Sequence, residues 1–237
     1  KIPILTAGVN AGNYRAIPVD LENPLNSEEL VDLKEYGIAG VSYYHLSDGS
    51  NQPYCQQLAG SIPQILARKS IAEMLARVNL RLDVLELELF VWDAYRPLAT
   101  QKGIWQFFWH NIKNDNPSFS DEVIYEKVID YVSDPNNFEA NDSRTWPTHM
   151  TGASVDLTIR RKADLESLDM GAHFDQMDII AHTNYFEDQL INGEIEKDDP
   201  MLTNRRLLYF VMSEQGFTNY PLEYWHFDWG NQMHQLI

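Results

Sequence analysis

Residues 84–97, VLELELFVWDAYRP, alternate apolar and acidic side chains before they reach a proline. The apolar positions of one parity are Leu85, Leu87, Leu89 and Val91. Glutamates stand between the first three, which is the period of two that a strand shows when only one of its faces is buried. Pro97 cannot donate a hydrogen bond to a sheet, so Asp93, Tyr95 and Arg96 are expected where the strand gives way to a loop.

Residues 147–159, PTHMTGASVDLTI, begin a second alternation at Ser154. Apolar side chains at positions 155, 157 and 159 form one face, so Asp156 is expected on the opposite face, away from the core. Small residues separate it from His149, and Gly152 can adopt the positive φ that a tight turn requires. A loop that carries His149 can therefore fold back against the strand that carries Asp156.

The last part of the chain predicts another strand with a histidine. Residues 224–229, YWHFDW, are expected to place Tyr224, His226 and Asp228 on one strand face. Just before them, residues 207–217, LLYFVMSEQGF, predict a short helix with Gly216 as its C-terminal cap.

Two more helices are predicted from the spacing of apolar side chains. Residues 63–78 show helical spacing after a proline suited to a first turn, and residues 100–111 form an aromatic segment expected to pack on the sheet. Strands and helices alternate irregularly, without the βαβ rhythm of a parallel sheet. We therefore predict an α+β fold, a compact single domain over residues 1–237 with a mostly antiparallel central sheet flanked by helices.

Two segments are expected to lie outside this regular framework. About residues 1–60 mix Asn, Gly, Pro and aromatic residues without a sustained period, which predicts an irregular N-terminal lead-in with short strands. About residues 111–146 hold a short amphipathic helix between polar, turn-rich flanks, which predicts a surface insertion.

The charge of the chain limits its partners. A formal net charge of -17 repels nucleic acid, anionic membrane surfaces and anionic cell-wall polymers, so a small or zwitterionic partner fits better. No apolar run approaches the roughly 20 residues of a membrane span. The single cysteine, Cys55, cannot form an intramolecular disulfide and is expected to be a small buried residue.

Two histidines and one carboxylate, His149, Asp156 and His226, predict a tetrahedral zinc site with the fourth position left for water. Glu223 precedes His226 by three residues and would bring a general base beside a metal ligand. Residues i and i+3 of a regular strand point to opposite faces, so Glu223 must lie on a turn or bulge, which Pro221 favours. The alternative is a surface glutamate and a strand histidine packed among tryptophans.

Five segments of this chain resemble a known family. WDAYRP, HMTGASVD, MGAHFDQMD, NRRLLYFVMSEQGF and EYWHF come in the same order, with similar gaps, as in the zinc D-alanyl-D-alanine dipeptidases of the vancomycin-resistance type. The resemblance spans about residues 91–227 and includes the pattern SxHxxGxAxD followed by ExxH. These dipeptidases belong to a wider group of zinc D,D-peptidases with a compact α+β fold.

The resemblance implies a role for each matching residue. One zinc ion per chain would be bound by His149, Asp156 and His226. Glu223 would be the catalytic base, Arg96 would stabilise the oxyanion, and Asp175 would hold the free amino group of the substrate. The alternatives are a structural ion pair between Arg96 and Asp93, and a solvated or helix-capping role for Asp175.

Two positions depart from the family pattern. Pro147 stands where the pattern has serine, so the substrate carboxylate needs a different partner here. Ser154 stands where the pattern has alanine. The segment between Arg96 and His149 is also long, which predicts a different rim for the pocket.

The expected function is zinc-dependent hydrolysis of D-Ala-D-Ala or a closely related D,D-dipeptide. The alternatives are a D,D-carboxypeptidase that acts on longer peptidoglycan peptides and a non-catalytic, zinc-stabilised binding module. The expected partner is a small dipeptide, with no nucleic acid and no membrane. We expect a cytoplasmic protein; because the chain begins at Lys1, removal of a leader and a periplasmic or exported location form the alternative.

Overall fold

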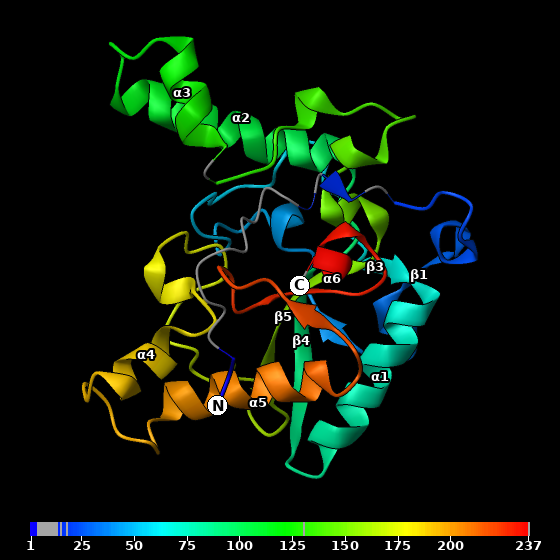
Figure 1. Cartoon of the computed structure of the whole chain (residues 1–237), viewed down its shortest axis with the longest axis vertical. Helices are drawn as coiled ribbons and strands as arrows, with labels where there is room; N and C mark the ends of the chain where they lie inside the picture. Colours follow the sequence, from blue (N-terminus) through cyan, green and yellow to red (C-terminus); the bar gives the residue numbers. More distant parts are fainter. Residues whose placement is uncertain (4–13, 15, 18, 130, 237) are drawn as a thin grey trace.

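Seven strands and six α-helices form the regular structure of the part of the chain that a computed structural model describes, residues 1–3, 14, 16–17, 19–129 and 131–236 (Figure 1). The strands are β1 (Leu30–Asp32), β2 (Ala39–Gly40), β3 (Leu66–Arg68), β4 (Leu87–Asp93), β5 (Ser154–Arg161), β6 (Thr218–Asn219) and β7 (His226–Asp228). The helices are α1 (Lys69–Asp83), α2 (Leu98–Asp115), α3 (Asp121–Val128), α4 (Tyr185–Ile191), α5 (Pro200–Ser213) and α6 (Gln232–Leu236).

Five of the strands form one sheet in the order β2-β4-β5-β7-β6. Only β2 and β4 run parallel, and the other three pairs are antiparallel. The two remaining strands, β1 and β3, form a separate antiparallel pair. The α+β class with a mostly antiparallel sheet is confirmed.

The centre of the sheet is the pairing of β4 with β5. Leu89 lies opposite Ile159 and Val91 opposite Leu157, and these four side chains are fully buried. The predicted inward faces of both strands are therefore confirmed. Strand β4 starts later than expected, however, because Leu85 lies in a turn in which Glu86 has a φ of 56°.

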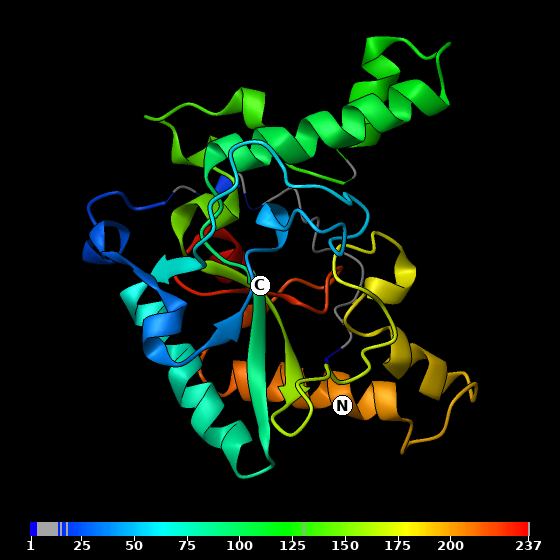
Figure 2. The same cartoon turned by 180° about the vertical axis from the view of Figure 1, so that it is seen from behind.

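The helices lie around this sheet and at its ends. Helix α1 packs along β4, and α5 lies near one end of the longest axis of the molecule, whereas α2 and α3 lie at the other (Figures 1 and 2). Helix α5 begins seven residues before the predicted segment 207–217 and includes its residues 207–213. Gly216 has the positive φ of 89° expected just beyond a helix end. The aromatic helix predicted at residues 100–111 is confirmed as the larger part of α2.

The helix predicted over residues 63–78 begins six residues later. Residues 66–68 form β3, which pairs with β1, and α1 starts at Lys69. The buried apolar face of α1 is confirmed, with Ile71, Leu75 and Val78 fully buried. The start was wrong because a pairing with a segment more than 30 residues away overrides the local helical period.

Two smaller predictions are wrong. Tyr224 lies in the turn before β7 rather than on the strand, and its hydroxyl donates to the carbonyl of Ala172. Cys55 is exposed rather than buried, in a loop where its φ is 51°. The predicted lead-in, about residues 1–60, lies partly outside the described residues, and its described part holds β1 and β2.

The turn that carries His149 ends at Gly152. A 3₁₀ helix, Thr148–Thr151, closes there, and Gly152 has a φ of 70°, which confirms the predicted positive value. A Cβ atom at this position would lie 2.6 Å from Leu30 Cδ2. Glycine is therefore favoured at this turn by its positive φ and by the closeness of the Leu30 side chain.

No helix in the described part of the chain combines the length and the apolar character that crossing a bilayer requires.

Replacing Gly152 with alanine is expected to destabilise the protein by roughly 1–3 kcal/mol, because a positive φ and a steric overlap act together. Gly193 is the matched control, since its φ of 73° is similar but nothing lies within 4 Å of an added Cβ. Urea unfolding should show a smaller loss for Gly193→Ala. Equal losses for the two variants would mean that the contact with Leu30 has no energetic weight.

Candidate active site

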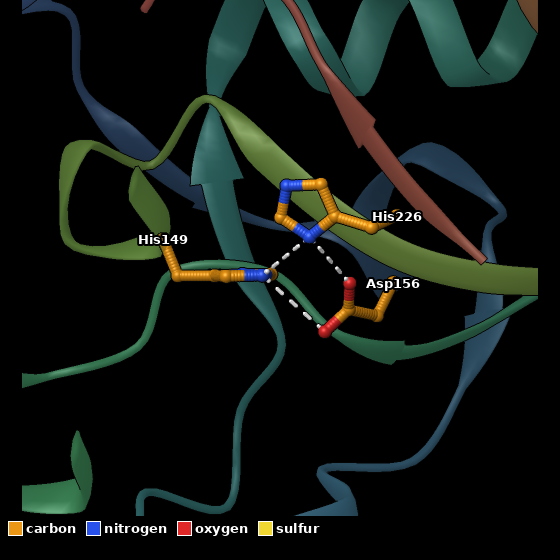
Figure 3. A group of neighbouring side chains, drawn as sticks. All are labelled: His149, Asp156 and His226. Atoms are coloured by element: carbon orange, nitrogen blue, oxygen red, sulfur yellow. Dashed lines mark hydrogen bonds and ion pairs between the residues drawn. The ribbon is translucent and has the colours of Figure 1, made fainter. Parts of the chain in front are cut away.

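His149, Asp156 and His226 converge on one point (Figure 3). His149 Nε2 lies 3.1 Å from His226 Nδ1 and 3.3 Å from Asp156 Oδ2, and His226 Nδ1 lies 3.0 Å from Asp156 Oδ1. All three residues are buried. The structure therefore brings the three predicted metal ligands together.

The sheet places two of these residues and the turn places the third. Asp156 in β5 and His226 in β7 are direct cross-strand neighbours, so their side chains emerge side by side on one face. His149 comes from the 3₁₀ turn that Gly152 closes, and its backbone carbonyl accepts from the N–H of Arg96. Local turn geometry and strand register together create the cluster.

Contacts behind the imidazole rings define which nitrogen faces the cluster. His149 Nδ1 lies 2.8 Å from the carbonyl oxygen of Ala94, and His226 Nε2 lies 3.0 Å from Asp228 Oδ2. A carbonyl and a carboxylate only accept hydrogen bonds, so these outer nitrogens carry the protons. The unprotonated nitrogens then face each other and the carboxylate of Asp156.

Three groups with electron pairs at such short distances are stable only with positive charge among them, which either a proton on His226 or a bound cation supplies. Burial by itself would raise the pKa of Asp156, but His149 and His226 outweigh it and hold that pKa below its usual range. Burial would lower the pKa of His226, but Asp228 and Asp156 raise it well above its ordinary value. Two imidazole nitrogens and one carboxylate are the donor set of a catalytic zinc site, so these residues fit a bound zinc ion.

Arg96 lies beside this cluster with its guanidinium held on several sides. Its Nε donates to Asp93 Oδ2 at 2.8 Å, its Nη1 to Gln101 at 3.1 Å, and its Nη2 lies 3.3 Å from Asp156 Oδ2. Burial would lower its pKa, but Tyr44 and the two carboxylates outweigh it and raise it. The ion pair with Asp93 and a position beside the metal ligands were predicted as alternatives for Arg96. The structure shows both, because Arg96 is ion-paired to Asp93 and also lines the site.

Glu223 lies on a turn rather than on the strand. The N–H of Glu223 donates to the carbonyl of Tyr220, and the N–H of His226 donates to the carbonyl of Glu223. This turn directs the carboxylate toward the cluster, with Oε2 3.9 Å from His226 Nδ1. Residues i and i+3 of a regular strand would point to opposite faces, but the turn lets Glu223 and His226 face the same site. Burial raises the pKa of Glu223.

Asp175 is buried, and it accepts hydrogen bonds from two tyrosines. The hydroxyls of Tyr44 and Tyr54 donate to its Oδ2 at 3.1 and 3.0 Å. Burial raises its pKa to about 7, with Asp156 and Glu223 adding to the effect and Arg96 opposing it. The alternative of a solvated charge is therefore wrong, and this carboxyl is poised to change its charge near neutral pH.

These groups face one cavity of about 490 Å³. Arg96, His149, Asp156, Asp175, Glu223 and His226 all line it. Residues of the predicted surface insertion form part of its wall, namely Tyr125, Ile129, Tyr131, Val132, Ser133, Asp134 and Asn137. The segment at about 111–146 therefore contributes directly to the cavity, together with Gln101, Ile104 and Phe108 of α2.

Several residues that contribute to the site were not identified from the sequence. Tyr54 and Gln101 carry no local pattern that marks them, because they reach the site only through tertiary contacts. Tyr44 packs in the hydrophobic core, and its hydroxyl also contacts Asp175 and Arg96. Asp228 did carry a signal, since its alternation with His226 places both on one face, which the structure confirms.

The chain was compared with protein families, with curated proteins and with solved structures. Residues 29–236 match the family model Peptidase_M15, described as D-ala-D-ala dipeptidase. A D-alanyl-D-alanine dipeptidase of Synechocystis sp. is 27% identical over 231 residues, 91% of each chain. That of Enterococcus faecalis is 26% identical over 166 residues, 70% of this chain and 74% of the other. A structure of VanYB in complex with D-Ala-D-Ala is 14% identical, with a TM-score of 0.44 over 72% of this chain and 78% of that one.

Replacing Asp175 with asparagine tests how burial acts on this carboxyl. A group whose pKa is 3.8 when unfolded and about 7 when folded binds more protons in the folded state, so it lowers the free energy of unfolding as pH rises through that window. We expect the metal-free Asp175→Asn protein to gain stability over the parent between about pH 4 and 7, by on the order of 4 kcal/mol above that window. Urea unfolding with a chelator present, repeated across this range, measures the difference. A difference that does not change with pH would contradict the assignment.

Proposed function

The chain belongs to the Peptidase_M15 family of D-Ala-D-Ala dipeptidases, and on that premise we propose that it hydrolyses D-Ala-D-Ala or a closely related D,D-dipeptide. The observation that carries this proposal is the convergence of His149, Asp156 and His226 beside Glu223 and Arg96 in one cavity. A metal-binding set, a carboxylate base and a fixed cation are the parts that metal-assisted peptide hydrolysis requires.

One zinc ion per chain would be held by His149 Nε2, His226 Nδ1 and the carboxylate of Asp156. A zinc ion with such ligands would supply a bound water whose pKa is lowered to about 7, and it would polarise a carbonyl group. The carbonyl of Ala94 holds His149 so that its Nε2 faces the other two ligands.

Glu223 is the proposed general base. Its carboxylate faces the three ligands from the turn before β7, and its side chain is about a quarter exposed, at 24%. It can therefore accept a proton from a nucleophilic water and deliver it to the leaving amine. Its raised pKa brings it nearer the working pH, which favours both halves of this transfer.

Arg96 is the proposed oxyanion partner. Asp93, Gln101 and Tyr44 hold the guanidinium in place, so it needs no reorganisation when negative charge develops on the substrate oxygen. A donor arranged in this way is worth on the order of 3 kcal/mol of barrier lowering. Neither Arg96 nor Glu223 is needed merely to hold a metal, which disfavours the non-catalytic binding module.

Asp175 is the proposed partner of the substrate ammonium. Both tyrosine hydroxyls reach Oδ2, and the described part of the chain brings no hydrogen bond to Oδ1. A cation at this oxygen would favour the charged form of a carboxyl whose pKa is otherwise about 7. A free amino terminus therefore gains an ion pair in a site that is mostly shielded from water.

The D,D-carboxypeptidase alternative is retained because of the size of the cavity. Its volume of about 490 Å³ lies within the range of drug-sized ligands, which exceed dialanine. A peptide longer than two residues would place an amide where the dipeptide has its ammonium. The two functions therefore differ in what they require at Asp175.

Replacing Glu223 with glutamine is expected to keep the fold and one equivalent of zinc but to lower kcat on D-Ala-D-Ala by about 100-fold or more. The amide preserves the shape of the side chain but cannot accept the proton from water. His149→Ala is the control, and it should lose the zinc together with the activity. Metal analysis and initial rates measure both, and a Glu223→Gln protein with normal turnover would exclude Glu223 as the base.

Capping the substrate tests the role of Asp175. N-acetyl-D-Ala-D-Ala should be cleaved about two to three orders of magnitude less efficiently in kcat/KM than D-Ala-D-Ala, because an unpaired buried charge costs roughly 3–5 kcal/mol. In Asp175→Asn, with its zinc content verified, this discrimination should largely disappear. Comparable cleavage of both substrates by the parent protein would favour the carboxypeptidase, and undiminished discrimination by the variant would place the amine elsewhere.

A further inference from the structure

A buried polar cluster lies behind His226, on the side away from the other two ligands. It consists of Ser154 at the start of β5, Asp228 at the end of β7 and Asn231 just before α6. The Ser154 hydroxyl donates to Asp228 Oδ1 at 2.7 Å, and the Asn231 amide donates to the same oxygen at 2.6 Å. Asn231 also donates to the Ser154 hydroxyl at 2.9 Å, so the three side chains form a closed network.

The second oxygen of Asp228 is directed at the metal-binding imidazole. Asp228 Oδ2 lies 3.0 Å from His226 Nε2, although the two atoms do not form a well-aligned hydrogen bond. Neither atom has another hydrogen-bond partner in the described part of the chain. The ring of His226 therefore stands between two carboxylates, Asp156 at Nδ1 and Asp228 at Nε2.

This arrangement is unfavourable unless positive charge lies nearby. Ser154 and Asp228 are fully buried and Asn231 nearly so, and a buried carboxylate needs hydrogen bonds and a cation or an N–H donor. Ser154 and Asn231 satisfy Oδ1, which leaves Oδ2 for the ring of His226. A carboxylate behind a ligand histidine holds the ring orientation, retains the proton on the outer nitrogen and makes the inner nitrogen a stronger donor.

We propose that Ser154, Asn231 and Asp228 act together as positioning residues that hold His226 for the metal and strengthen its bond to it. The proposal rests on the zinc site of the proposed function. It also gives a role to Ser154, which stands where the pattern SxHxxGxAxD has alanine. Alanine has no donor for Asp228, and the cross-strand pairing of Ser154 with Asp228 brings this serine within reach of the carboxylate.

The experiment measures zinc affinity rather than turnover. The metal-free parent, Asp228→Asn and Ser154→Ala proteins are titrated with zinc against a chelator of known affinity. Asp228→Asn keeps the shape of the side chain but loses the charge, and its zinc affinity should fall about 10–100-fold. Ser154→Ala should show a smaller loss in the same direction. Zinc binding by both variants as tight as that of the parent would overturn the proposal.

A double variant separates a linked role from general damage to the fold. If Ser154 acts through Asp228, the Ser154→Ala/Asp228→Asn protein should bind zinc no more weakly than Asp228→Asn alone. Losses that multiply would show that Ser154 acts independently, which would also overturn the proposal. Thr158→Val is the matched control, because it removes a buried β5 hydroxyl that has no hydrogen-bond partner in the described residues, and it should leave the affinity unchanged.

Cobalt provides a second measurement that a general loss of stability would not change. The visible absorption bands of Co²⁺ bound to the parent should shift in Asp228→Asn, because the donor strength of His226 changes, but not in Thr158→Val. Should Asp228→Asn fail to fold, the affinity and spectrum of Ser154→Ala decide the question.

The outcome is separable from that of the proposed function. A parent that binds one zinc but does not cleave dipeptides would leave this inference standing and refute the function. A parent that cleaves D-Ala-D-Ala, with variants that bind zinc as tightly as the parent, would support the function and refute this inference. A parent that binds no zinc would refute both.

Discussion

The pairing of β5 with β4 on one edge and with β7 on the other is the constraint on which the site depends. It aligns Asp93, Asp156 and His226 in one row across three adjacent strands. The register shift between Val91 and Asp93 completes this row, since it brings Asp93 opposite Asp156. Arg96 and Glu223 lie in the chain segments just beyond the two ends of the row, so strand register also decides where the other reactive groups lie.

Acidic side chains in and around this row lie in a poorly solvated place. Asp93, Asp156, Asp175 and Asp228 are buried, while Arg96 is the one lysine or arginine among the described residues that line the cavity. Buried carboxylates are stable only when paired, hydrogen-bonded or bound to a metal. The structure therefore favours a cation at the centre, and a zinc ion held by His149, Asp156 and His226 meets that requirement.

The two departures from the family pattern have different consequences. Ser154 is fully buried and takes part in the network behind His226. Pro147 lines the cavity, where it offers no side-chain donor to a substrate carboxylate. Another part of the wall comes from Tyr125, Ile129, residues 131–134 and Asn137, in the segment that was predicted to be a surface insertion. Substrate selection is therefore where we expect this chain to differ most from its relatives.

Arg96 and Asp175 were implied by the family resemblance, whereas the sequence by itself determined the α+β class, the inward faces of β4 and β5, the turn at Gly152 and the candidate ligands His149, Asp156 and His226 with Glu223 beside them. These features depend on short-range rules, namely the period of two, the conformational freedom of glycine and the spacing of a motif. Only the tertiary structure decided that residues 66–68 pair with β1, that Tyr44 and Tyr54 contact Asp175, and that Gln101 contacts Arg96. Each of those contacts joins an unmarked residue to a partner across the fold, and the register and packing that bring them together leave no trace in the local pattern of side chains.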